Sequence, residues 1–176
     1  MLVIGDIYNI KNKKNESYSV NPIVEMALMV YISITFLGYW GLLSWQDFDM
    51  TGGTNPTPIR LFLSGSGNYI VHGIAPTLAI VHWVLFSPHT KQKFVKAFYF
   101  LIYPILYLVF ILIRASVGAP LYGDTYYPYP FVDLNALGVG YFLLIVAGLL
   151  LFFSLWGFLF VYINNLINAK LNRAVK

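Results

Sequence analysis

Cysteine is absent from this chain of 176 residues, and charged residues make up only 10% of it. The absence of cysteine excludes disulfides, a thiolate nucleophile and zinc or iron–sulfur sites with cysteine ligands. A soluble domain usually carries about 25% charged residues, so the low charge places the chain outside that class. The net charge of +4 arises from basic residues that flank apolar segments rather than from one patch. We therefore expect no nucleic-acid partner.

Hydrophobic residues make up 59% of the sequence and gather in long runs. Runs of about 20 apolar residues are long enough to cross a bilayer as helices. We predict an all-α fold, a polytopic integral membrane helical bundle with about four transmembrane helices. The expected spans are residues 22–46, 68–87, 94–115 and 136–163, preceded by a segment over 1–21 and followed by a tail over 164–176.

Individual residues indicate how the spans begin and how their polar groups are satisfied. Asn21, followed directly by proline, is typical of a helix start. Glu25 is near that start, so we expect it to reach water. Ser33 and Thr35 lie in mid-span, where hydroxyls usually bond to carbonyls of their own helix or to a neighbouring helix. Pro104 falls inside the third span, which is tolerated where neighbouring groups satisfy the freed carbonyl.

The distribution of basic residues predicts the orientation. The N-terminal segment, the turn over 91–96 and the C-terminal tail hold nine of the eleven Lys and Arg residues. Cytoplasmic loops carry an excess of these residues. We therefore expect both termini in the cytoplasm and a multi-pass location in the cell membrane.

The second span carries the most informative polar residue, His72, one helical turn before Pro76. Ionisable residues inside a membrane are costly and mark functional sites by default. His72 is our candidate catalytic general base, with Asn68 on the same helix face. The alternative is a structural histidine that hydrogen-bonds to a neighbouring helix.

Three further residues lie towards the outer side and are candidates for substrate binding: Tyr107, Arg114 and Asp133. Arg114 could bind the carboxylate or phosphate of a lipid, or anchor its helix at the interface. Asp133 could orient His72 or pair with Arg114. The spacing of the three histidines is unlike a metal-ligand pair, so we expect neither a metal site nor another cofactor.

Three stretches resemble the bacterial six-helix branch of the androgen-induced membrane protein family. They are HGIAPTLAIVHWVLF at 72–86, YPILYLVFILIRA at 103–115 and YYPYPFVD at 126–133. The resemblance implies an intramembrane hydrolase that cleaves fatty-acid esters of hydroxy fatty acids with a threonine nucleophile and a histidine. His72 matches the family histidine that precedes a proline by four residues.

The sequence departs from this family at its N-terminus. The family threonine lies on a helix that precedes the one at 22–46, and the chain shows no such helix. The stub MLVIGDIYNI, followed by KNKK, indicates the end of a lost helix, so we expect an internal start or a fragment.

Two main functions remain open from the sequence. The chain is either a lipid-ester hydrolase whose threonine-bearing helix is missing, or a non-catalytic membrane or lipid-binding subunit of a larger assembly. A transporter subunit, a third reading, would need a partner to complete a polar path. The expected partners are membrane lipids, and a second copy of the chain or another membrane subunit that packs on glycine-rich faces.

Overall fold

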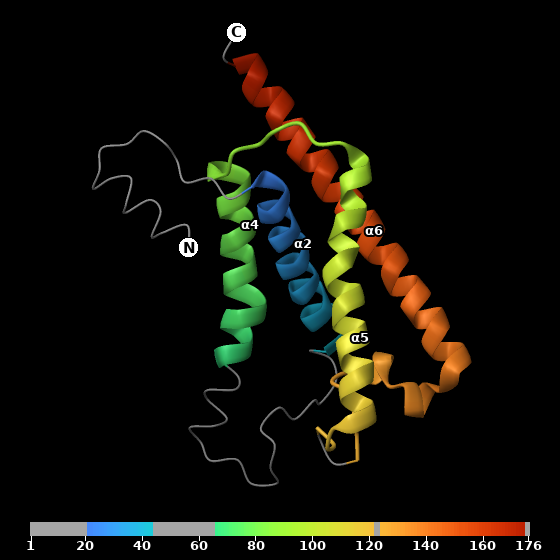
Figure 1. Ribbon diagram of the computed structural model, residues 1–176. Coiled ribbons are helices and arrows are strands. Elements are labelled where there is room, and N and C mark those ends of the chain that lie inside the picture. Colours follow the sequence, from blue (N-terminus) through green and yellow to red (C-terminus); the bar gives the residue numbers. More distant parts are fainter. Residues whose placement is uncertain (1–20, 44–65, 122–123, 175–176) are drawn as a thin grey trace.

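The computed structural model describes residues 21–43, 66–121 and 124–174, and the regular elements in these ranges are helices (Figure 1). In chain order they are α2 (Pro22–Gly38), the π-helix η1 (Tyr39–Leu43), the π-helix η2 (Ile70–Ile74), α4 (Ala75–Phe86), the 3₁₀-helix η3 (Phe94–Leu101), α5 (Ile102–Val117), the 3₁₀-helix η4 (Pro130–Val132) and α6 (Leu134–Ala174).

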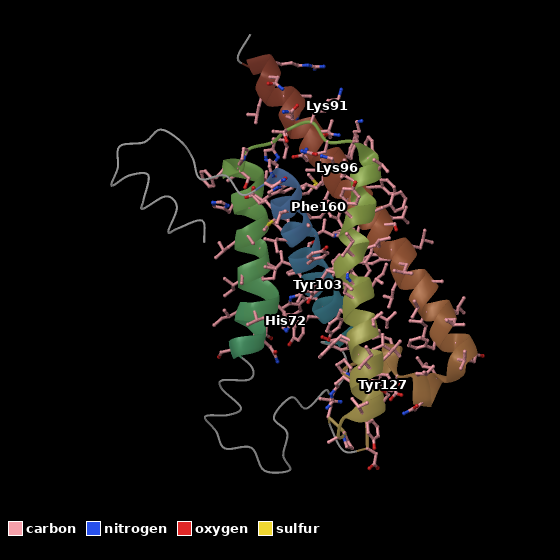
Figure 2. The ribbon with its side chains drawn as sticks, in the orientation of Figure 1. His72, Lys91, Lys96, Tyr103, Tyr127 and Phe160 are labelled. Atoms are coloured by element: carbon pink, nitrogen blue, oxygen red, sulfur yellow. The ribbon has the colours of Figure 1, made fainter. Side chains whose placement is uncertain are left out.

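Four helical stretches are long and apolar enough to cross a membrane. The prediction of a helical protein with about four such helices is therefore confirmed. The stretches cover Pro22–Gly41, Ser66–Phe86, Phe94–Val117 and Leu134–Arg173. Each stretch runs opposite to the one before it (Figure 1). The start of α2, the end of α4 and the start of η3 therefore lie together, beside the part of α6 around Asn164 and Asn168, and α6 continues beyond them (Figure 1). We name this the basic end, because Lys91 and Lys96 lie there (Figure 2). The other end is named the distal end.

Capping groups set the ends of these helices. Asn21 caps α2 as predicted, because its Oδ1 accepts from the backbone N–H of Ile23 at 3.0 Å. Ser87, which precedes a proline, leaves the helical region with ψ 147° and so ends α4. Gly118 ends α5, where an added Cβ would lie 2.7 Å from the carbonyl oxygen of Arg114. Only glycine allows that close approach.

Prolines within the apolar spans lie where the helix changes its hydrogen-bond register. Pro76 is the second residue of α4, directly after the π-helix η2. Pro104 is the third residue of α5, directly after the 3₁₀-helix η3. Proline lacks the N–H that a regular helix uses for its i to i−4 hydrogen bond, so the change of register falls where that donor is missing. Each proline is thus placed in the first turn of a new register.

The last helix differs most from the prediction. α6 is 41 residues long and continues to Ala174, whereas the sequence predicted the end of the span at Ile163. Asn164 and Asn165 were expected to begin a polar tail, but they remain helical because they bond to the connection between α4 and η3. Near its start the helix is interrupted at Gly138, whose φ of 70° favours glycine.

Two apolar clusters hold the helices together. The basic-end cluster joins α2, α4, η3 and α6 and consists of Met26, Val30, Trp83, Ala97, Phe100, Phe160 and Val161. The distal cluster joins α5, the following connection and α6 and consists of Ile111, Tyr127, Val132 and Phe142. Gly157 lets η3 approach α6 closely, since an added Cβ would lie 2.9 Å from the ring of Phe100.

Candidate functional site

His72 lies in η2, towards the distal end of the second membrane helix (Figure 2). Its backbone carbonyl would normally accept from the N–H four residues later, but that residue is Pro76. The indole of Trp40 supplies a donor instead, with Nε1 3.0 Å from the carbonyl oxygen of His72. Because proline cannot donate, the carbonyl of His72 is available to Trp40. This hydrogen bond joins η2 to η1, at the end of the first membrane helix.

The imidazole ring of His72 packs against the same region of the first helix. It stacks on Tyr39, with ring centroids 4.4 Å apart and an interplanar angle of 8°. Its Nδ1 atom is buried and has no hydrogen-bond partner. The sequence left open a structural histidine whose ring hydrogen-bonds to a neighbouring helix. Nδ1 makes no such hydrogen bond. Asn68 lies one turn before His72 and is partly exposed.

The two hydroxyls on α2 are already engaged. Ser33 Oγ donates to the carbonyl of Val30 at 2.8 Å and accepts from the indole Nε1 of Trp156 at 2.8 Å. Thr35 Oγ1 donates to the carbonyl of Tyr31 at 3.0 Å. The prediction that these hydroxyls bond to their own helix is confirmed. None of these hydrogen bonds involves His72, with which an activated nucleophile would be paired.

Arg114 and Asp133 hold the connection between α5 and α6. The guanidinium of Arg114 donates through NH1 to the carbonyl of Tyr126 at 2.9 Å and through NH2 to the carbonyl of Ala119 at 2.8 Å. Asp133 Oδ1 accepts from the backbone N–H groups of Asn135 and Ala136, both at 3.0 Å, and so caps α6. Both side chains therefore have local structural roles.

Aromatic rings extend along α5 from this connection. Tyr107 stacks between Tyr103 and Phe110, with centroids 6.2 Å and 6.5 Å away. In the connection, burial and the negative charge of Asp133 raise the pKa of Tyr127 above its ordinary value. Among the described residues, no hydrogen bond or ring contact joins this group to His72. The predicted site residues thus form two groups on different helices.

A polar network at the basic end was missed by the sequence reasoning. Its first member is Glu25, which was expected to be solvated but is only 6% exposed. That expectation was wrong, because the carboxylate turns inward and accepts from Ser87 Oγ at the end of α4. The contact joins the first turn of α2 to the last turn of α4.

The other side of this network is built by α6. Asn164 Nδ2 donates to the carbonyl of Thr90 at 2.7 Å, and Asn168 Nδ2 donates to the carbonyl of His89 at 2.6 Å. Asn165 bonds to both backbone groups of Gln92, at 2.8 Å and 2.9 Å. Three asparagines therefore bind the connection between α4 and η3. Asn164 and Asn168 are four residues apart and directly follow an apolar run. This spacing was the sequence signal that could have indicated a polar face on α6.

His89 lies at the centre of the network and is 7% exposed. Its Nδ1 is 3.0 Å from Asn164 Oδ1, and its Nε2 is 3.1 Å from the carbonyl oxygen of Trp83. Within the described ranges, no group of three or more His, Asp or Glu side chains could hold a metal ion.

Comparisons of the chain with protein-family models, curated proteins and solved structures gave no match. The resemblance of 72–86, 103–115 and 126–133 to the androgen-induced membrane protein family therefore stays a prediction. The function has to be argued from the geometry of the side chains.

Proposed function

We propose that this chain is a multi-pass membrane protein with its basic end in the cytoplasm. Four helices of suitable length and the gathering of lysines at one end support this orientation. Because the chain has no cysteine, single cysteines report topology without background. In intact cells an impermeant maleimide should label Asp124→Cys, and it should label Lys91→Cys only after permeabilisation. The reverse pattern contradicts the orientation.

We further propose that the function is to bind a membrane lipid at His72, without catalysis. The observation that supports it is the buried Nδ1 of His72, which has no hydrogen-bond partner. A polar atom left unsatisfied in an apolar environment costs about 1–3 kcal/mol. Once the side chains that cover this nitrogen move aside, a polar lipid group that binds it would remove the cost. Stacking on Tyr39 holds the ring in place for such a contact.

Lipid-ester hydrolysis is the second candidate and would use the same nitrogen as a general base. It needs a nucleophile as well, and the hydroxyls of Ser33 and Thr35 are bonded to their own helix. The family resemblance implies a threonine on a helix before 22–46, a part of the sequence that lies outside the described residues. Lipid binding needs no such residue, so we place it first.

The two candidates differ in what the loss of His72 does. The protein is purified in a mild detergent, and the lipids that it retains are measured by mass spectrometry. His72→Phe should lose the bound lipid, while the control His82→Phe, which changes an exposed ring on α4, should retain it. Equal retention by both variants contradicts lipid binding at His72.

The same preparations are assayed with a fluorogenic fatty-acid ester. Lipid binding alone predicts no turnover by the wild-type protein. Turnover by the wild type that is lost in His72→Phe and kept in His82→Phe supports the hydrolase instead.

A further inference from the structure

Backbone groups fix the orientation of the amide side chains around His89. Asn165 Oδ1 accepts from the backbone N–H of Gln92 at 2.8 Å, and its Nδ2 donates to the carbonyl of Gln92 at 2.9 Å. An amide side chain is ambiguous only where its neighbours can both donate and accept. A backbone N–H only donates and a carbonyl only accepts, so the amide of Asn165 has one possible orientation.

This orientation determines that of Asn164. Its Nδ2 lies 2.7 Å from the carbonyl oxygen of Thr90 and 3.2 Å from Asn165 Oδ1. Both neighbours are acceptors, so the amide nitrogen of Asn164 must face them. Its Oδ1 therefore faces His89 Nδ1 at 3.0 Å.

Both ring nitrogens of His89 consequently face oxygens that only accept. Nδ1 faces Asn164 Oδ1, and Nε2 faces the carbonyl of Trp83 at 3.1 Å. A neutral imidazole carries a hydrogen on one nitrogen and a lone pair on the other. Either neutral tautomer would direct a lone pair at an oxygen, whereas the imidazolium donates to both.

We infer that His89 is held as a buried imidazolium whose two N–H groups join the end of α4 to α6, forming a joint that loosens when the ring loses a proton. Trp83 lies in the last turn of α4, where the helix dipole favours a positive charge. The indole ring of Trp83 is 5.1 Å from the imidazole, within the range of a cation–π contact. Asn168 also binds the backbone carbonyl of His89 and so fixes the position of the main chain that carries the ring.

A buried cation also needs a compensating charge. A buried carboxylate lies in the same part of the fold, because Glu25 accepts from Ser87, two residues before His89. The positive charges of nearby lysines disfavour a second cation. One of them, Lys96, donates from Nζ to Gln92 Oε1 at 2.9 Å. The titratable and charged groups on the surrounding elements are Glu25 on α2, His82 on α4, Lys91 and Lys93 in the connection, Lys96 on η3, and Lys170 and Arg173 on α6.

The direction of the pH response follows from the hydrogen bonds. Protonated, the ring makes two bonds, one to each helix. After it loses a proton, one bond is replaced by repulsion between a lone pair and an oxygen. The joint between α4 and α6 is therefore closed at lower pH and loosens as the pH rises.

Nitrogen NMR of the full chain, isotope-labelled at histidine and held in lipid nanodiscs, tests the protonation state. The chain has only three histidines, so His72→Gln and His82→Gln assign the signal of His89 without altering the network. The exposed ring of His82 serves as the comparison in the same spectrum. We expect both nitrogens of His89 to be protonated. One protonated and one unprotonated nitrogen overturns the inference.

The joint itself is tested with spin labels at Leu85→Cys on α4 and Leu171→Cys on α6, both exposed positions. As the pH is raised until the His89 signal loses its second proton, the distance distribution between the labels should shift or broaden. A pair at Ile74→Cys and Val139→Cys, towards the distal end, should not change. An unchanged distribution at the basic end shows that the ring does not control the joint.

Discussion

Replacement of Asn164 by leucine tests whether the asparagines of α6 hold the basic end together. Asn164 is 1% exposed and makes three hydrogen bonds, to His89, Thr90 and Asn165. Hydrogen bonds between membrane helices average about 0.6 kcal/mol, so three are worth about 2 kcal/mol. The ring of His89 would remain buried without this partner, which adds up to about 3 kcal/mol. We expect a loss of stability between about 2 and 5 kcal/mol.

The loss is measured as the free energy of unfolding by sodium dodecyl sulfate in mixed micelles. Asn172→Leu on the same helix is the matched control. Asn172 is exposed and donates one hydrogen bond, to Asn168 Oδ1 at 3.2 Å. Its loss should cost about 0.5 kcal/mol or less. If Asn164→Leu costs no more than this control, the network does not stabilise the basic end and the reasoning is refuted.

Three further variants test other contacts by the same unfolding assay or by proteolysis. Gly157→Ala should destabilise by about 1–3 kcal/mol because the new Cβ would lie 2.9 Å from a ring carbon, whereas Gly148→Ala, with nothing within 4 Å, should be neutral or slightly stabilising. Trp40→Phe should lower the free energy of unfolding by about 1 kcal/mol, because it removes the donor to the carbonyl of His72. The loss should be smaller in a Pro76→Ala background, where a backbone N–H is available to that carbonyl. Equal costs in the two backgrounds contradict that account. Arg114→Lys keeps the charge but cannot reach both carbonyls, so limited proteolysis should cut the connection after α5 faster; an unchanged rate contradicts the role.

The spans were predictable because apolar run length is a local property of the sequence. The start of α2 at Pro22 agrees with the prediction, since the cap at Asn21 involves only the next few residues. The helix α6 continues past residue 163, where the predicted span ends, and the sequence reasoning had assigned the polar residues beyond it to a tail by composition alone. Asn164 and Asn168 lie in a helix because their partners are in a connection about 75 residues earlier. Such partners are not visible in a single sequence.

The burial of Glu25 was missed for the same reason. A carboxylate in the first turn of a membrane helix would reach water if the helix stood alone. Here the end of α4 covers it and Ser87 donates to it. Conversely, the sequence did single out His72, because an ionisable residue in an apolar run stands out without knowledge of its neighbours. Its open Nδ1 could only be found from the structure.

His72 and His89 differ in a way that separates stability from function. Both ring nitrogens of His89 and its backbone carbonyl have hydrogen-bond partners, which fits a structural role at the basic end. His72 keeps one buried nitrogen without a partner, although Tyr39 and Trp40 hold its ring and backbone firmly. Folding alone would favour an apolar residue at this position, because an unsatisfied buried nitrogen costs about 1–3 kcal/mol. The presence of histidine there is explained if the nitrogen acquires a partner from the membrane, and the lipid-retention test at His72 decides that point.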